Sequence, residues 1–442
     1  MMTMVHHWWE RVRASYWFVP SQMVVLAIAM AGGMIVLDET LAPRAGRWWA
    51  LIYVGGPDGA RTLLSTIAGS MMTVAGVTFS ITIVALTLTS SQFGPRLLRN
   101  FMRDLGNQVV LGTFLATFAY CLFVLRAVHG DESQGFVPYL ALNVAIALAL
   151  VGLGVLIYFI HHVSTSIQAD RVMASVSGEL NAAIDRLYPE PLEHESDERE
   201  PPAAVLRPDA TTDERPILAA RSGYVQAIDL DGLMRLAVNR NVVLSLKYRP
   251  GQFVTAGTVL AMGSPPDRVM DELAQEVNAC HLLGVQRTLE QDVEFAIHQL
   301  VEIAVRALSP GVNDPFTAMT CLDWLGASIC RILERRFPVS VLHDEEGTLR
   351  LVVSRTTVAG VLDAAFNQIR QCARENTAVT IRLVETLAVI AAMTRSESDR
   401  LAVLHHTRMI ERGSLDGLRE ERDQADVRER VEAVMRALNA DT

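Results

Sequence analysis

Charged residues are missing from long stretches of the first 165 residues, although the chain as a whole contains 49 acidic and 39 basic residues. Four runs contain no Asp, Glu, Lys or Arg: Ala14–Leu37, Leu63–Phe93, Leu105–Leu125 and Ser133–Ile160. An α-helix needs roughly 20 residues to cross the ~30 Å hydrocarbon core of a bilayer, so each run is long enough. From Gln168 onward no comparable run occurs. The sequence therefore predicts a four-helix transmembrane domain, residues 1–165, followed by a large water-exposed region.

Basic charge, paired cysteines and catalytic motifs are also scarce or missing, and this excludes several classes of protein. The net charge of −10 argues against nucleic-acid binding, which needs a basic surface, and Lys247 is the one lysine in the chain. The five cysteines include no CxxC pair, which is typical of free thiols in a reducing compartment rather than of a disulfide framework. We find no HExxH sequence, phosphate-binding loop or nucleophile–base signature. We therefore expect no nucleic-acid partner, no cofactor, no metal and no enzymatic activity.

Arginines indicate the orientation in the membrane. They lie before the first run, between the second and third runs, and after the fourth run, whereas the opposite loops mix arginine with acidic residues. Cytoplasmic loops of membrane proteins carry an excess of positive charge. The pattern therefore predicts that both termini and the loop between the second and third spans are cytoplasmic.

The second run differs from the others in length and composition. As one helix its 31 residues would measure ~46 Å, which exceeds the hydrocarbon core, so the helix is tilted, projects from the membrane or is broken. Small and hydroxyl-bearing residues share about one third of its circumference. The candidate pore-lining residues among them are Thr66, Ser70, Thr73, Ser80 and Thr87. Two interpretations stay open: close helix packing, or the lining of a water-filled path in an oligomer.

The water-exposed half begins with a helical segment and a linker. Residues 166–188 have helical spacing and are expected to continue the fourth span as a stalk. Residues 189–216 are rich in proline and acidic residues, which predicts a linker that does not fold alone. Residues 264–442 are expected to form a mainly helical cytoplasmic domain. The expected helices are 266–280, 288–308, 314–336, 357–375, 378–394, 396–412 and 417–438, with a β-hairpin near 339–354.

Residues 217–263 have the pattern of short β-strands. The segments SGYV, PGQFV and GTVLA resemble the small barrel of biotinyl and lipoyl carriers. A carrier needs its modified lysine at an exposed hairpin tip, but the expected tip here is Asn239-Arg240-Asn241, and Lys247 lies within a strand-like stretch. We therefore expect a β-barrel-like module that serves structure or docking and carries no covalent group.

The segment Arg287–Ala318 has the densest motif of the chain. An amphipathic helix ends at Ser309-Pro310-Gly311, and Asp314 is placed to cap the next helix with Pro315 in its first position. Glu294, His298 and Glu302 follow one another at four-residue spacing. Their ends are ~12 Å apart on a helix, so the three cannot meet on one metal ion.

Two stretches carry a family resemblance: QDVEFAIHQLVEIAVRALSPGVNDPFTA, and SSQFGPRLLRNF after the second run. They resemble the bacterial membrane-protein family called domain of unknown function (DUF) 2254. The resemblance implies a protein of the bacterial inner (plasma) membrane that has a membrane domain and a cytoplasmic domain. It implies no established activity. The matching positions are candidates for importance: Gln92, Pro95, Arg96, Asp292, Arg306, Ser309, Asn313, Asp314 and Thr317.

We therefore expect an α-helical integral membrane domain followed by a cytoplasmic α+β region with a small β-barrel-like module and a helical domain. The first functional hypothesis is a homo-oligomeric channel or transport protein whose second span lines the path and whose cytoplasmic domain assembles or gates it. The alternative is a membrane-anchored sensor or scaffold whose cytoplasmic domain binds a ligand or a partner protein. Besides other copies of the chain, the lipid bilayer is the expected partner.

Overall fold

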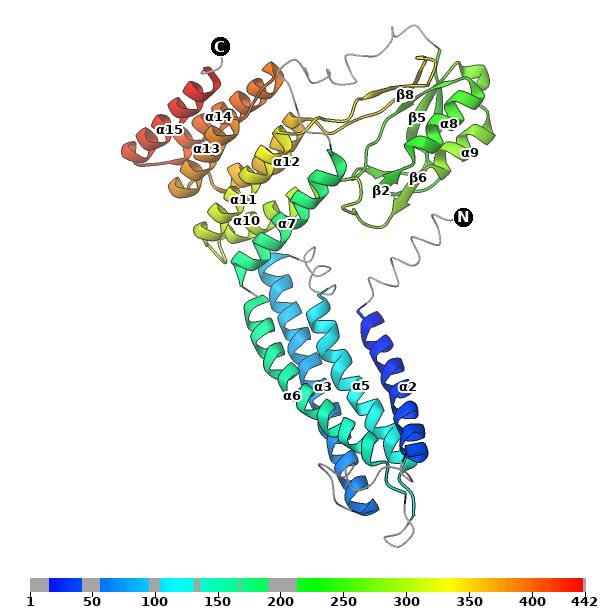
Figure 1. Ribbon diagram of the computed structural model, residues 1–442. Coiled ribbons are helices and arrows are strands. Elements are labelled where there is room, and N and C mark those ends of the chain that lie inside the picture. Colours follow the sequence, from blue (N-terminus) through cyan, green and yellow to red (C-terminus); the bar gives the residue numbers. More distant parts are fainter. Residues whose placement is uncertain are drawn as a thin grey trace. The chain divides into compact units, whose positions relative to one another are not determined.

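The computed structural model describes residues 16–41, 56–94, 104–130, 136–166, 168–189 and 213–439. The chain divides into two compact units, Met1–Arg171 and Val172–Thr442, which we call unit 1 and unit 2. Figure 1 shows that the described part of unit 1 is helical, whereas unit 2 combines strands and helices. The expected organisation, a helical membrane region followed by a mixed α/β region, is confirmed at this level.

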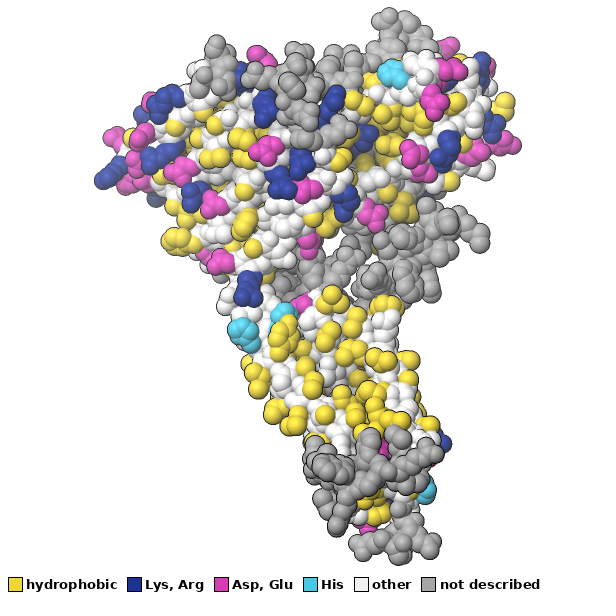
Figure 2. Space-filling view, in the orientation of Figure 1, with side chains coloured by type: hydrophobic (Ala, Val, Ile, Leu, Met, Phe, Trp, Pro, Cys, Tyr) yellow, Lys and Arg dark blue, Asp and Glu magenta, His cyan; other side chains and the backbone are white. Residues whose placement is uncertain are grey.

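The described part of unit 1 contains four apolar helices, one for each charge-free run: α2 (Phe18–Leu41), α3 (Pro57–Phe93), α5 (Leu105–Ala127) and α6 (Tyr139–Ser166). Each is long and apolar enough to cross a membrane. Helix α5 packs against the other three. Apolar side chains, including those of Leu64, Phe114 and Tyr120, are fully buried between the helices. The outward surface is also largely apolar, as Figure 2 shows, which suits contact with lipid.

Two carboxylates join the ends of these helices. Asp38, buried near the end of α2, accepts hydrogen bonds of 2.9 Å from the backbone N–H groups of Leu140 and Ala141 in the first turn of α6. Asp104 caps α5 by accepting from the N–H of Gly106, and its other oxygen lies 2.5 Å from Nε2 of His162 on α6. Helix N-termini leave N–H groups without intrahelical partners and attract negative charge. Each acid therefore satisfies a helix start.

A fifth helix meets the same length and composition criterion. It is α11 (Pro315–Leu333), which belongs to unit 2 and includes Asp323 and Arg331. Its apolar residues, such as Leu322, Leu325 and Ile329, are buried against α10 (Val293–Ala307) and α13 (Thr377–Ala391). The apolar composition of α11 is therefore explained by its place in the core of unit 2.

The strands in the described residues of unit 2 form two sheets. One has the order β1 (Arg215–Leu218), β5 (Val259–Ser264), β3 (Val243–Leu246), β8 (Leu349–Val352), β7 (Val341–His343). The other has the order β4 (Phe253–Val254), β2 (Gly223–Ile228), β6 (His281–Gly284). Strands β3 and β8 pair in parallel and the other pairs are antiparallel. The expected hairpin near 339–354 corresponds to β7 and β8.

The expected barrel within residues 217–263 is wrong in two respects. First, the strands do not close into a barrel, and β6, β7 and β8 come from outside this range. Second, the supposed hairpin tip at Asn239-Arg240-Asn241 is the end of a helix, α8 (Leu230–Arg240), which Asn241 terminates with a positive φ of 47°. Asp229 starts this helix by accepting from the N–H of Gly232. Apolar residues at helical spacing, including Leu233 and Ala237, bury one face.

The remaining elements of unit 2 are helical: α7 (Ala169–Leu187), η3 (Pro266–Arg268), α9 (Asp271–Ala279), α12 (Val358–Cys372), α14 (Glu397–Gly417) and α15 (Glu421–Asn439). The segment expected as a stalk is α7. The carboxylate of Asp185 receives hydrogen bonds of 2.9 and 2.7 Å from Arg331 on α11 and one of 2.8 Å from Arg335. The bond from Arg331 lowers the pKa of Asp185. This segment therefore packs within unit 2 from Val172 onward.

Candidate functional site

The candidate pore-lining residues all lie on an exposed face of α3, which measures ~55 Å over its 37 residues. Thr66, Ser70, Thr73, Ser80 and Thr87 are exposed, as are Gly69 and Gly76 between them. A β-carbon placed on either glycine would meet no atom within 4 Å. We call this set of residues the α3 stripe. Within one chain nothing covers the described part of this face.

The hydroxyl groups of the α3 stripe are bonded to their own helix. The hydroxyls of Thr66, Thr73, Ser80 and Thr87 donate to the carbonyl oxygen four residues earlier, at 2.7 to 2.9 Å. Such back-bonding satisfies the proton and leaves the oxygen lone pairs facing outward. The stripe is therefore a row of hydrogen-bond acceptors. Three other hydroxyl-bearing residues of α3, Thr78, Thr82 and Thr89, are buried and do not belong to the stripe.

The family-motif residues after α10 build a tight connection to α11. The Ser309 hydroxyl donates to the carbonyl of Arg306, and Asn313 has a φ of 50°. The carboxylate of Asp314 accepts from the N–H and the hydroxyl of Thr317, at 3.1 and 2.6 Å, as a cap of α11. The hydroxyl bond lowers the pKa of Asp314. Here the motif supports a helix-to-helix turn.

The remaining family-motif positions are Arg306 on α10 and those in the stretch SSQFGPRLLRNF. Arg306 lies 3.4 Å from Glu302 on the same helix. Gln92 is exposed in the last turn of α3. Pro95 and Arg96 lie outside the described residues. Within unit 2, Asp292 lies at the start of α10 and the α10–α11 turn follows its end, so these motif positions do not form one site.

The start of α10 carries a cluster of paired charges that spacing alone does not reveal. Arg287 donates two hydrogen bonds, of 2.7 and 2.9 Å, to Asp292, which caps α10. A third bond, of 2.8 Å, joins Arg287 to Nδ1 of His298. Arg249, which follows β3, lies 2.7 Å from Glu294 and donates to the hydroxyl of Thr356. The cluster therefore joins the sheets to the helices.

The charged residues of this cluster pair with one another and have a structural role. Asp292 and Glu294 each face an arginine, and Tyr188 lies close by, where burial and the charge of Glu294 raise its pKa to about 12. Among the described residues, no group of three His, Cys, Asp or Glu side chains is arranged for a metal ion. Arg249 was not identified from sequence because its partner is 45 positions away. Nothing in the local spacing signals such a pair.

Comparison with known proteins shows which family model and which proteins this chain is similar to. A family model described as predicted membrane protein (DUF2254) matches residues 13–389. Proteins described as uncharacterised from Mycobacterium bovis and from two strains of Mycobacterium tuberculosis are 35% identical over 426 residues. Those alignments cover 94% of this chain and 79% of each relative. No solved structure matches.

Proposed function

The chain belongs to the DUF2254 family of predicted membrane proteins, and from that premise we propose that it works as a homo-oligomeric channel lined by α3. The observation that carries the proposal is the exposed α3 stripe. Helix α6 exposes large apolar side chains such as Leu150, Leu153 and Ile157 to its surroundings, as a lipid-facing helix does. The α3 stripe instead exposes glycine and hydroxyl oxygens, and the exposed side chains of Val77 and Val84 interrupt it.

Several copies are needed for such a path. Apolar side chains, including those of Leu64, Phe114 and Leu142, occupy much of the space between the described helices of one chain, and the α3 stripe faces outward. A path along the α3 stripe would therefore run between neighbouring copies rather than inside one bundle. Small residues allow helices of neighbouring copies to approach closely. Residues seven apart drift only ~20° per step around a straight helix, so Thr66, Thr73, Ser80 and Thr87 stay on one side.

The direction of the hydroxyl bonds suggests which solutes would pass. Each proton points to a backbone carbonyl of α3, so the oxygen lone pairs are what a solute would meet. Oxygen ligands of this kind replace part of the hydration shell of a cation and repel an anion. We therefore propose small cations as the permeant class.

The test is flux through protein reconstituted in liposomes, with K⁺, Na⁺ and Cl⁻ compared. Ser80→Ala removes one oxygen and Ser80→Leu places a bulky apolar group on the stripe. We expect both to reduce cation flux with the oligomer intact, the second more strongly. Ile81→Leu is the matched control, because Ile81 is exposed on α3 outside the stripe. Cation flux unchanged by Ser80→Leu would overturn the proposal.

A second function is favoured by a different feature of the same residues. Because each hydroxyl proton is already satisfied by its own helix, the stripe can pack against protein without any water. The protein would then be a self-assembling scaffold with no path. This alternative predicts no flux from the wild type across varied ions, pH and membrane tension. It also predicts that Ser80→Leu disperses the oligomer, measured by size-exclusion light scattering in detergent.

A further inference from the structure

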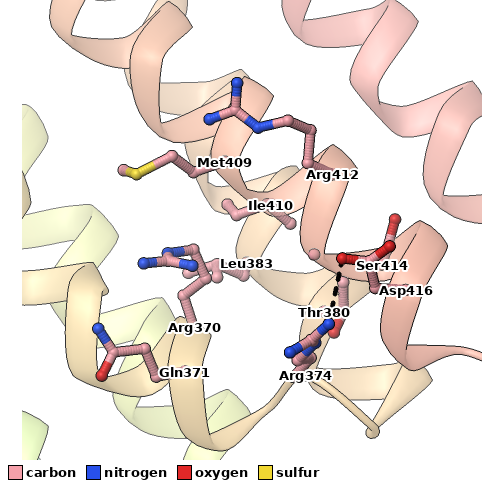
Figure 3. Close-up of a pocket in the computed structure, with 11 residues that line it drawn as sticks. Arg370, Gln371, Arg374, Thr380, Leu383, Met409, Ile410, Arg412, Ser414 and Asp416 are labelled. Atoms are coloured by element: carbon pink, nitrogen blue, oxygen red, sulfur yellow. Dashed lines mark hydrogen bonds and ion pairs between the residues drawn. The ribbon is translucent and has the colours of Figure 1, made fainter.

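A cavity of about 460 Å³ opens between α12, α13 and α14 in unit 2, away from the α10 cluster. Figure 3 shows the residues around it. They include three arginines, Arg370, Arg374 and Arg412, and one acidic residue, Asp416. Ligand sites for small molecules span ≈ 300–1,000 Å³, so this cavity has the volume of one. Its charge is unusual in a chain whose net charge is −10.

One of the three arginines is neutralised and the others are not. Arg374 donates a hydrogen bond of 3.1 Å to Asp416, drawn as a dashed line in Figure 3. Arg370 makes no such pair, and its Nε is buried with no hydrogen-bond partner among the described residues. Asp363, on the same helix, is engaged by His406 at 3.2 Å and by Asn367 at 2.9 Å. The cavity therefore has positive charge that no acid in its lining balances.

An unpaired arginine at the wall of a cavity needs an explanation. Leaving a buried charged donor without a partner costs free energy, so such groups are normally paired. Every arginine of the α10 cluster that we describe has a carboxylate partner, in contrast to Arg370. An anion in the cavity would balance the charge of the Arg370 guanidinium group.

The shape of the guanidinium group and the apolar part of the lining indicate which kind of anion would bind. A planar guanidinium matches the oxygens of a phosphate group in a two-pronged arrangement, better than a point charge does. Leu383, Met409 and Ile410 line the cavity beside the arginines and offer apolar surface. A ligand with a phosphate at one end and a flat or apolar group at the other would satisfy both.

We propose that this cavity binds a phosphate ester of nucleotide size, held by Arg370 with support from Arg412. This is independent of whether α3 lines a channel or packs as a scaffold. The site also has room for a blocking side chain: a β-carbon at Gly413, which lines the cavity, would meet no atom within 4 Å. A large residue there would fill the cavity without changing its charge.

The experiment is calorimetric titration of the full chain in detergent with ADP, inorganic pyrophosphate and adenosine. We expect ADP and pyrophosphate to bind and adenosine to bind at least tenfold more weakly. Arg370→Met should weaken ADP binding at least tenfold, and Gly413→Leu should do the same. Arg408→Ala, an exposed position on α14 outside the cavity lining, is the control and should change the affinity less than twofold.

The melting temperature separates a binding role from a structural one. Because Nε of Arg370 has no hydrogen-bond partner among the described residues, Arg370→Met should leave the melting temperature without ligand unchanged or raise it. ADP should stabilise the wild type and not the variant. A second arm replaces ADP with micelles containing phosphatidic acid. Stabilisation by the lipid alone, still dependent on Arg370, assigns the phosphate to a lipid headgroup. No effect of any phosphate compound at millimolar concentration, or equal affinity of Arg370→Met, overturns the proposal.

Discussion

Gly251 lies so close to the carboxylate of Asp292 that a β-carbon at this position would overlap with it. The glycine has a φ of 91°, and its N–H donates to the carbonyl of Val225 in β2. Asp292 in turn caps α10 and accepts a hydrogen bond from Arg287. A backbone turn at the edge of a sheet thus packs directly against the buried charge pair that starts the central helix of unit 2.

This contact predicts that Gly251→Ala destabilises unit 2 more than an ordinary glycine substitution does. Gly257 is the matched control, because it also has a positive φ, of 83°, but open space where a β-carbon would lie. We expect Gly257→Ala to cost about 1–2 kcal/mol from backbone strain alone. Gly251→Ala should cost a further ~1–3 kcal/mol, because it displaces Asp292 as overpacking does. Chemical denaturation in detergent, followed by circular dichroism, measures both. Equal losses would show that the contact carries no energy.

The capping of α6 by Asp38 predicts a cost within unit 1. Asp38→Asn keeps the size of the side chain but leaves one accepting oxygen for the N–H groups of Leu140 and Ala141. We expect a loss of ~1 kcal/mol, the usual value of a helix cap. Glu39→Gln is the control, since Glu39 is the exposed neighbour. Thermal unfolding in detergent compares the two. A loss as large for Glu39→Gln would assign the effect to charge in general.

Two buried histidines predict that unit 2 loses stability in mild acid. His281 is buried, and its Nδ1 donates to the carbonyl of Val277 while Nε2 has no partner among the described residues. Burial lowers the pKa of His281, and burial likewise lowers that of His406. The unfolded chain, with a histidine pKa of about 6.5, therefore binds protons that the folded chain does not. Stability should be full above pH ~6.5 and fall below it, by at most about 1.4 kcal/mol per pH unit for each proton.

The variant His281→Asn isolates one of these histidines. Its amide N–H group can still donate to Val277 but does not titrate. The free energy of unfolding between pH 7.5 and 5.5 should change less in this variant than in the wild type. If the free energy of unfolding changed with pH as much in the variant as in the wild type, groups other than His281 would cause the loss of stability in this range.

The membrane helices could be predicted from the sequence because one physical requirement dominates them. A span must avoid charge for about 20 residues, and this signal survives without any tertiary contact. The cap of α11 by Asp314 was equally local, since the acid and Thr317 are three residues apart. The orientation and the role of the α3 stripe remain predictions.

The sheets of unit 2 could not be predicted in the same way. Strand β3 pairs with β8, about a hundred residues later, and β2 pairs with β6 although two α-helices and three strands lie between them in the chain. The segment around Gly232 has a turn-like sequence, yet Asp229 and the spacing of Leu233 and Ala237 make it helical. The cavity of Arg370 and Arg412 was missed for the same reason, because its residues come from three helices and share no motif.

The orientation of the protein can be tested with a native cysteine. Cys372 is exposed, whereas Cys121 and Cys321 are buried. Cys280 and Cys330 are partly covered, and burial raises the pKa of both thiols, which slows their reaction with a maleimide. Labelling of the wild type therefore reports mainly on Cys372 in unit 2.

If unit 2 is cytoplasmic, a membrane-impermeant maleimide should not label Cys372 in intact cells and should label it after permeabilisation. The opposite side is reported by Asp58→Cys in a Cys372→Ser background, because Asp58 is exposed at the start of α3. That variant should be labelled in intact cells. The two sites are at positions that the arginine bias places on opposite faces, so they must give opposite results. Efficient labelling of Cys372 in sealed cells, with Asp58→Cys protected, would reverse the orientation and place the cavity of Arg370 outside the cytoplasm.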